Sequence, residues 1–86
     1  MGKRVLYVGG LAETISDWQL RELFGAYGLV ASAHVVRHKN SDKSAGYGFM
    51  AMASEEHALL AVVALEGTEF AGRCMRIYVT RIRQNQ

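Results

Sequence analysis

With 86 residues, of which half are apolar and 21% are charged, the chain has the size and composition of one small folded domain rather than of a disordered segment. Its longest uninterrupted apolar run, residues 58–65, is far shorter than the roughly 20 residues of a membrane-spanning helix, and no basic-then-apolar leader opens the chain. We therefore expect no membrane association and no secretion, and the single cysteine, Cys74, favours a reducing compartment, the cytoplasm or, in a eukaryote, the nucleus.

The first predicted elements in chain order are a strand and a capped helix. Residues 4–8 form a run of apolar, β-branched and aromatic side chains that ends at two glycines, which is typical of a strand. Ser16 and Gln19 then match the capping box of a helix N-terminus, and apolar side chains follow at helical spacing. We predict a helix over residues 16–27 that ends with Gly28 at the C′ position.

The rest of the chain predicts three more strands and one more helix. The valine-rich segment 29–38 is typical of a strand, the polar segment 39–44 is typical of a loop, and residues 47–52 predict a third strand. A second helix is predicted over residues 54–66 because a serine can cap it and a glycine can end it. Residues 76–81 alternate basic or polar with apolar side chains and predict a fourth strand.

The predicted order of elements is β-α-β-β-α-β, which is the order of the ferredoxin-like split β-α-β fold. In this α+β fold class, two helices cover one face of a four-stranded antiparallel sheet. We expect a single domain over residues 1–83 and a short tail over residues 84–86. Because the other face of the sheet stays open in this fold, the functional residues are expected there.

Side chains of a strand alternate between the two faces of its sheet, which divides each predicted strand into a core set and an outward set. The predicted core positions are Leu6, Val8, Ala33, Val35, Gly48, Met50, Met52, Met75, Ile77 and Val79. The predicted outward positions are Val5, Tyr7, His34, Val36, Tyr47, Phe49, Ala51, Arg76, Tyr78 and Thr80. Folding alone gives no reason to hold four rings in water, whereas aromatic faces stack on unpaired bases with about 1–3 kcal/mol per base. The outward set therefore predicts binding of single-stranded nucleic acid.

The formal net charge of +2 is distributed unevenly along the chain. The two predicted helices sum to −4, whereas all other residues sum to +6. A basic surface of strands and loops is a candidate for binding a polyanion. The candidate phosphate contacts lie in the loop after the second strand and behind the fourth strand, and they are Lys39, Lys43, Arg81 and Arg83.

Two of the predicted strands carry the motifs of a known family. Residues 6–11 (Leu-Tyr-Val-Gly-Gly-Leu) resemble the hexamer of the RNA recognition motif, and residues 45–52 (Ala-Gly-Tyr-Gly-Phe-Met-Ala-Met) resemble its octamer. Residues 20–28 are similar to the first helix of the family, and a Gly-Arg pair at 72–73 precedes the last strand as it does in the family. The resemblance covers essentially the whole chain.

The resemblance implies a small RNA-binding protein or domain with a post-transcriptional role. It implies that Tyr7 and Phe49 stack on successive bases and that Tyr47 packs against the sugars. Ala45 stands where the octamer normally has a Lys or Arg that contacts a phosphate, and Lys43 in the adjacent loop is the candidate substitute. The implied partner is single-stranded RNA, and single-stranded DNA stays open as an alternative because contacts to the 2′-hydroxyl are not visible in a sequence.

Other kinds of site find little support in the sequence. Residues 46–51 match the pattern G-x-G-x-x-A, but a strand rather than a helix follows, so no nucleotide cofactor is predicted. His34 and His38 would lie about 13 Å apart on one strand, which is too far for one metal ion. No nucleophile stands beside a base in a recognisable order, so no enzymatic activity is predicted.

A protein-binding module is the alternative interpretation of the chain. In the second predicted helix, the side chains at helical spacing that would face the core leave Leu59, Leu60 and Val63 pointing partly away from it. These three side chains are a candidate surface for weak self-association or for a protein partner, although scattered surface leucines are the simpler interpretation. The Arg-x-Phe motif, through which some family members bind peptides, is not matched, because Thr68 replaces the arginine before Phe70.

Overall fold

The computed structural model describes residues 4–80, whose helices and strands follow the predicted order with one addition. The elements are β1 (Arg4–Gly9), α1 (Asp17–Gly25), β2 (Val30–Arg37), β3 (Ser44–Met52), α2 (Glu55–Leu65), β4 (Glu69–Phe70), β5 (Arg73–Cys74) and β6 (Arg76–Thr80). Strands β4 and β5 are the addition, since no strand was predicted between α2 and the last strand.

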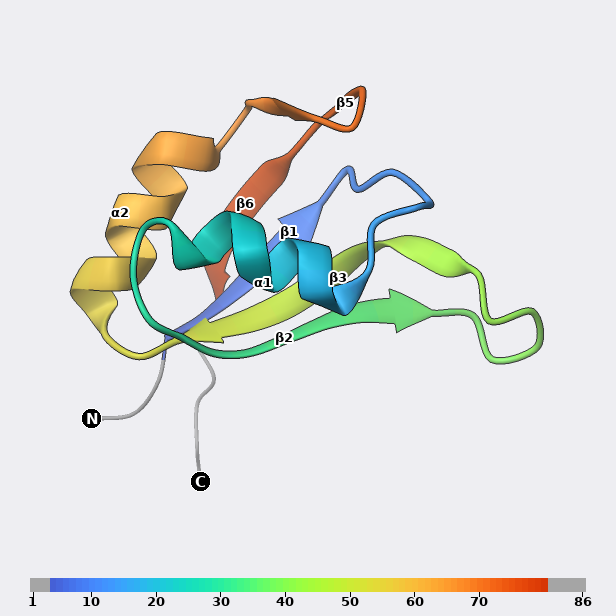
Figure 1. Cartoon of the computed structure of the whole chain (residues 1–86), viewed down its shortest axis with the longest axis horizontal. Helices are drawn as coiled ribbons and strands as arrows, with labels where there is room; N and C mark the ends of the chain where they lie inside the picture. Colours follow the sequence, from blue (N-terminus) through green and yellow to red (C-terminus); the bar gives the residue numbers. More distant parts are fainter. Residues whose placement is uncertain (1–3, 81–86) are drawn as a thin grey trace.

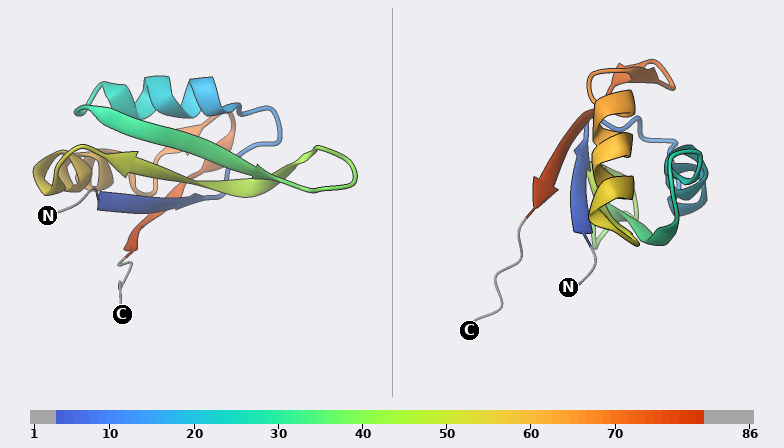
Figure 2. Two further views of the ribbon diagram at one scale, coloured as in Figure 1. Left: turned by 90° about the horizontal axis from the view of Figure 1, so that it is seen from below. Right: turned by 90° about the vertical axis from the view of Figure 1, so that its left-hand side faces the viewer.

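The main sheet is antiparallel and contains four strands in the spatial order β2-β3-β1-β6. In Figure 1 the two helices lie in front of this sheet, and the turned views of Figure 2 show that both helices lie on the same face. Within residues 4–80, no helix covers the opposite face, which we call the open face. The arrangement confirms the predicted ferredoxin-like split β-α-β fold.

The hydrophobic core lies between the sheet and the two helices. Its fully buried large side chains are Phe24, Leu6, Ile15, Leu20, Met50, Met52, Met75, Val8 and Val35. Each apolar side chain of this size contributes roughly 1.5–3 kcal/mol when it is fully buried. The prediction for Val79 was wrong: this residue is 42% exposed, because it lies on the edge strand β6, with no strand beyond it. Ala51 pairs with Val5 and so faces outward as predicted, but it is only 7% exposed.

Helix α1 begins as predicted but ends earlier. The Ser16 hydroxyl accepts a hydrogen bond from the Gln19 backbone N–H at 3.2 Å, and the Gln19 side chain accepts one from the Ser16 backbone N–H at 3.0 Å, which completes the capping box. The helix ends at Gly25, and Gly28 does not adopt the left-handed backbone of a C′ residue, so its predicted role was wrong. Instead, the imidazole of His57 packs against Gly28, where a Cβ atom would lie 2.9 Å from the imidazole Cδ2 and closer still to Cγ.

Strands β4 and β5 form a small hairpin that the sequence did not reveal. Phe70 pairs with Arg73, and Ala71 and Gly72 make the turn with φ values of 54° and 85°. A positive φ at both turn positions is the geometry for which Asn-Gly or Asp-Gly is the usual sequence signal. Because alanine occupies the first position, the turn lacks this signal. The hairpin nevertheless contributes to folding, since Phe70 packs against the core.

Candidate nucleic-acid interface

Outward side chains of the four strands are aligned in rows across the open face. Tyr7 of β1 pairs with Phe49 of β3 on one side and with Tyr78 of β6 on the other, and Phe49 pairs with His34 of β2. Directly paired residues of antiparallel strands project to the same face of the sheet. Tyr78, Tyr7, Phe49 and His34 therefore form one row, which we call the central row.

A fourth aromatic side chain lies beside the central row, toward the β2–β3 loop. Gly9 of β1 pairs with Tyr47 of β3 and with Arg76 of β6, which places these two side chains in the next row of the open face. On the opposite side of the central row, Val5 pairs with Thr80, whose hydroxyl donates a hydrogen bond to the Val5 carbonyl at 3.0 Å. The rings are thus concentrated at the end of the sheet that is closer to the β2–β3 loop.

Tyr7 is at the centre of the four rings. Its ring centroid lies 5.7 Å from that of Tyr47, 5.8 Å from that of Phe49 and 5.9 Å from that of Tyr78. The Tyr7 and Tyr78 rings are nearly parallel at 24°, whereas Phe49 meets Tyr7 edge-on at 67°. Gly9 makes this arrangement possible, because a Cβ atom at Gly9 would lie only 2.7 Å from the Tyr7 hydroxyl oxygen. The rings therefore form one contiguous surface with favourable mutual contacts.

This surface remains accessible to a ligand. Phe49 is 39% exposed and Tyr78 is 51% exposed, while Tyr7 and Tyr47 are half-buried between their neighbours. The structure thus brings together on the open face the four aromatic side chains that strand alternation had placed there. Exposed ring faces can stack on the bases of a single strand with little dependence on sequence, because every base has a flat face.

At the β6 edge of the open face, Arg76 is held by an acidic side chain. Glu66, which follows the last turn of α2, accepts a hydrogen bond from the Arg76 Nε at 3.2 Å and accepts another from the backbone N–H of Ile77. The guanidinium is thereby fixed beside the rings while it stays exposed to solvent. Sequence reasoning missed Glu66, because no local pattern indicates that a residue at the end of a helix will reach an edge strand.

A similar contact is present at the β2 edge. Asp17, the first residue of α1, accepts a hydrogen bond from the Val35 backbone N–H at 2.7 Å through Oδ1. Its Oδ2 lies 3.8 Å from Nδ1 of His34, the last member of the central row. An edge strand leaves backbone groups unpaired, and a side-chain acceptor at such a site satisfies one of them. Asp17 was also missed by sequence reasoning, for the same reason as Glu66.

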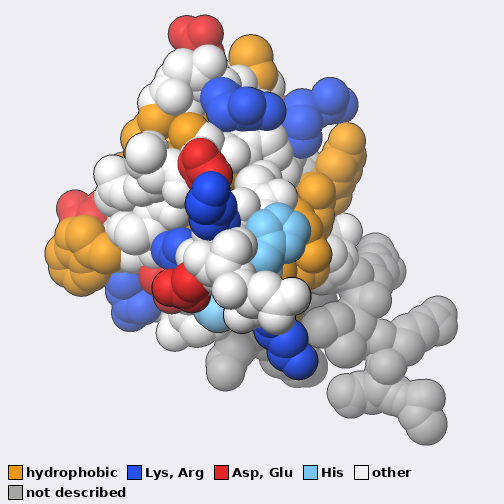
Figure 3. All heavy atoms as spheres, turned by 90° about the vertical axis from the view of Figure 1, so that its right-hand side faces the viewer, with side chains coloured by type: hydrophobic (Ala, Val, Ile, Leu, Met, Phe, Trp, Pro, Cys, Tyr) orange, Lys and Arg blue, Asp and Glu red, His pale blue; other side chains and the backbone are white. Residues whose placement is uncertain are grey.

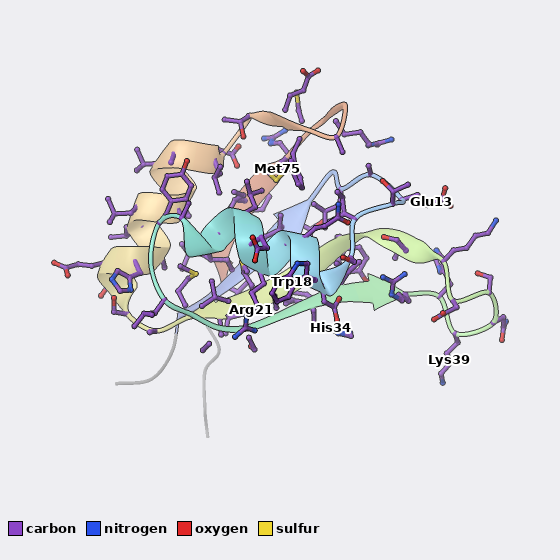
Figure 4. All side chains as sticks on the ribbon, viewed as in Figure 1. Glu13, Trp18, Arg21, His34, Lys39 and Met75 are labelled. Atoms are coloured by element: carbon purple, nitrogen blue, oxygen red, sulfur yellow. The ribbon has the colours of Figure 1, made fainter. Side chains whose placement is uncertain are left out.

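Two predicted phosphate contacts, Lys39 and Lys43, lie in the β2–β3 loop. This loop extends beyond the end of the sheet in Figure 1, and Figure 4 shows Lys39 projecting from it. Both side chains are exposed, and a hydrogen bond from the His38 backbone N–H to the Lys43 carbonyl at 2.8 Å closes the loop. Figure 3 looks at this end of the molecule and shows Lys and Arg side chains near a strip of hydrophobic ones.

The remaining predicted site residues are in other places. Arg81 and Arg83 lie outside the described residues. Leu59, Leu60 and Val63 are all exposed on α2, and Val63 is the most exposed of them at 84%. Because α2 lies on the helix-covered face of the sheet, this apolar surface is separate from the rings of the open face.

Comparison with known proteins agrees with this geometry. A family model described as the RNA recognition motif matches residues 6–76. The 31 kDa chloroplastic ribonucleoprotein of Nicotiana sylvestris is 37% identical over 81 residues, which are 94% of this chain and 26% of that protein. The chain thus spans about a quarter of the length of this curated relative.

Solved structures give the same result. The crystal structure of the RNA-binding protein PG1 superimposes with a TM-score of 0.89 at 32% identity, and the match covers 95% of this chain and 99% of that chain. An Sxl-lethal protein–RNA complex superimposes with a TM-score of 0.83 at 29% identity, covering 88% of this chain and 47% of that chain.

The comparisons bear on location and on family. The Nicotiana relative is named as chloroplastic, so the cytoplasmic location predicted from the sequence is not confirmed. None of the helices within residues 4–80 is long and apolar enough to cross a membrane. The family match extends from the first ring-bearing strand to the start of the last one, and it includes both predicted motifs. The chain belongs to the RNA recognition motif family.

Proposed function

We propose that this chain binds single-stranded RNA across the open face of its sheet and catalyses no reaction. The observation that carries the proposal is the central row, in which the rings of Tyr78, Tyr7 and Phe49 lie side by side and accessible. Unpaired bases offer flat faces to such a surface, whereas the bases of a duplex are already stacked on one another. The ribonucleoprotein relative and the similar protein–RNA complex support RNA as the partner.

Each ring has a separate proposed role. Tyr7 and Phe49 are direct cross-strand neighbours and stack on successive bases. Tyr47, which is half-buried next to both of them, packs against the sugars. Tyr78 extends the stacking surface onto β6 with a ring that is nearly parallel to Tyr7. These assignments make Tyr7 and Phe49 the two side chains on which affinity depends most strongly.

Phosphate contacts are proposed for the basic side chains of the β2–β3 loop and of the segment after β6. On a single strand, each neutralised phosphate contributes about −0.7 to the slope of log affinity against log salt concentration. With about three such contacts, we expect a slope near −2. Ala45 supplies no cation within the octamer, so the affinity of this single domain is expected to be modest. The proposed phosphate contacts are Lys39, Lys43, Arg81 and Arg83, while His34 and Arg76 are proposed to contact RNA beside the rings.

An NMR titration tests the proposal. The isotope-labelled chain is titrated with random-sequence single-stranded RNA and, in parallel, with DNA of the same length. We expect amide shift changes in β1 and β3, with the largest near Tyr7 and Phe49, and little change in α1 and α2. Changes confined to α2, or no change at high RNA concentration, would contradict the proposal. Equal shift changes with DNA would support the open face as the binding surface and would show that it binds single-stranded DNA as well as RNA.

A protein partner or a second copy on α2 is a second proposed binding mode. The observation that favours it is the apolar outer surface of that helix, where Val63 projects beside Leu59 and Leu60. Because this surface and the rings lie on different faces, both modes are sterically compatible. We also propose a post-transcriptional role, which the ribonucleoprotein relative supports. The single cysteine of this sequence, Cys74, favours a reducing compartment.

A further inference from the structure

His34 ends the central row at the edge strand β2, and a fixed carboxylate lies beside it. The hydrogen bond from the Val35 N–H to Asp17 Oδ1, at 2.7 Å, holds the carboxylate in place, and Oδ2 lies 3.8 Å from the His34 Nδ1. Asp17 is also in the first turn of α1, where the helix dipole stabilises a negative charge. The His34 and Asp17 side chains are 70% and 52% exposed, so protons and a ligand can reach both.

Among the described residues, Asp17 is the charged side chain that lies within 4 Å of the His34 imidazole. α1 also carries Arg21, one helical turn beyond Asp17, and Figure 4 shows Arg21 and His34 along the border between α1 and β2. The neighbours of His34 on the sheet are uncharged: Phe49 is paired with it on β3, and Ser32 and Val36 lie two positions away on β2. The protonation state of His34 therefore decides whether the His34–Asp17 pair is negative or neutral.

We propose that the His34–Asp17 pair links RNA binding to proton uptake, with an RNA phosphate as the group recognised. This inference rests on the proposed function. While the imidazole is neutral, the His34–Asp17 pair carries a net charge of −1, which repels a phosphate. When the imidazole is protonated, the pair becomes neutral, and the Nε2–H on the side of the ring away from Asp17 donates a charge-assisted hydrogen bond to a phosphate oxygen. Phosphate binding in turn favours the protonated ring.

The direction of the pH dependence follows from this charge change. Histidine is the side chain that changes its charge between about pH 5 and 8, whereas carboxylates stay ionised over most of this interval. Affinity for RNA should therefore rise as the pH falls from about 8 to about 5.5. Neither the phosphates nor the bases of RNA change protonation in this interval, so the ligand adds no dependence of its own.

The test measures RNA affinity by fluorescence anisotropy at both ends of this interval, at fixed salt, with a random-sequence single-stranded RNA. We expect the wild type to bind about five-fold more tightly at the lower pH. His34→Gln should lose this difference and bind RNA with the same affinity at both pH values. Asp17→Asn keeps an acceptor for the Val35 N–H but removes the repelling charge, so it should bind more tightly than the wild type at the higher pH. His38→Gln, in the exposed β2–β3 loop, tests the other histidine near the proposed interface and should keep the pH dependence.

Calorimetry of RNA binding in two buffers of different ionisation enthalpy gives an independent count of protons. We expect net proton uptake on RNA binding for the wild type and no uptake for His34→Gln. A wild-type affinity that does not change with pH would overturn the inference, and so would a pH profile that survives in His34→Gln and is lost in His38→Gln. A wild type that binds no RNA at either pH would contradict the proposed function itself.

Discussion

The imidazole of His57, in the first turn of α2, packs directly against Gly28 in the turn between α1 and β2. The neighbouring Leu29 backbone N–H donates a hydrogen bond to the His57 Nδ1 at 3.2 Å. A Cβ atom at position 28 would lie 2.9 Å from the imidazole Cδ2 and closer still to the ring's Cγ and to the His57 Cβ. This contact joins the two helix-containing halves of the fold, and it depends on the absence of a side chain at Gly28.

Gly28→Ala should therefore destabilise the domain. The added methyl group must displace either the imidazole or the turn, and such overpacking costs typically about 1–3 kcal/mol. Gly25→Ala is the matched control, because a Cβ atom at Gly25, the last residue of α1, would have no neighbour within 4 Å. The control should stabilise the domain by up to about 1 kcal/mol through helix propensity. Urea denaturation measures both changes, and a shift of the same sign for both variants would contradict this account of position 28.

Asp17→Ala should destabilise the domain without disturbing the rings. The substitution removes the acceptor of the Val35 N–H, and an unsatisfied backbone donor costs about 1–3 kcal/mol where it is shielded from water. Asp17→Asn retains an acceptor and loses only the charge at the start of α1, which is worth about 0.3–1 kcal/mol. The free energies of unfolding from denaturant titrations distinguish the two. An alanine variant as stable as the asparagine variant would show that the hydrogen bond contributes nothing.

The two loop lysines should determine part of the salt dependence of RNA binding. Lys39→Gln and Lys43→Gln are each expected to reduce the magnitude of the log affinity against log salt slope by about 0.7, because each removes one phosphate contact. Arg73→Gln, in the β4–β5 hairpin, removes a charge of the same sign and should leave the slope unchanged. The slopes come from anisotropy titrations at several salt concentrations. Equal slopes for the wild type and both lysine variants would exclude the β2–β3 loop from the RNA interface.

Self-association through α2 should depend on its exposed apolar side chains. Leu59→Glu places a charge in the middle of that surface and should abolish any rise of molar mass with concentration in light scattering. Thr14→Glu, in an exposed loop, adds the same charge elsewhere and should behave as the wild type. A wild type that is strictly monomeric at high concentration rules out self-association and leaves only a heterologous partner for this surface.

Strand alternation was sufficient to predict the ring surface, because the two register shifts in the pairing of β2 with β3 lie outside it. The register shifts lie between Val30 and Ser32 and between Val35 and Arg37, so the pairing of His34 with Phe49 is regular. The alternation on β1 and β6 is uninterrupted, which places Tyr7 and Tyr78 next to each other. A sequence pattern with a period of two therefore carried most of the information about the site.

Contacts between distant segments were not predictable in the same way. The hydrogen bonds of Asp17 and Glu66 to edge strands depend on how each helix is placed over the sheet, and no local spacing encodes that placement. Gly28 was interpreted as a helix-ending residue because it follows the predicted helix. The structure instead needs a glycine there because the His57 side chain, 29 residues away in the sequence, fills the space that a Cβ atom would occupy. Ala71 adopts a left-handed conformation that its residue type does not favour, so the β4–β5 turn was missed.

RNA affinity of the double variant Tyr7→Ala/Phe49→Ala tests the central claim most directly. With stacking worth about 1–3 kcal/mol per base, the account predicts that affinity for random-sequence single-stranded RNA falls at least about thirty-fold while the domain stays folded. Trp18→Ala is the control, because this aromatic side chain is 65% exposed on α1, on the other side of the sheet, and its loss should leave affinity unchanged. A folded double variant that binds RNA as tightly as the wild type would contradict the account.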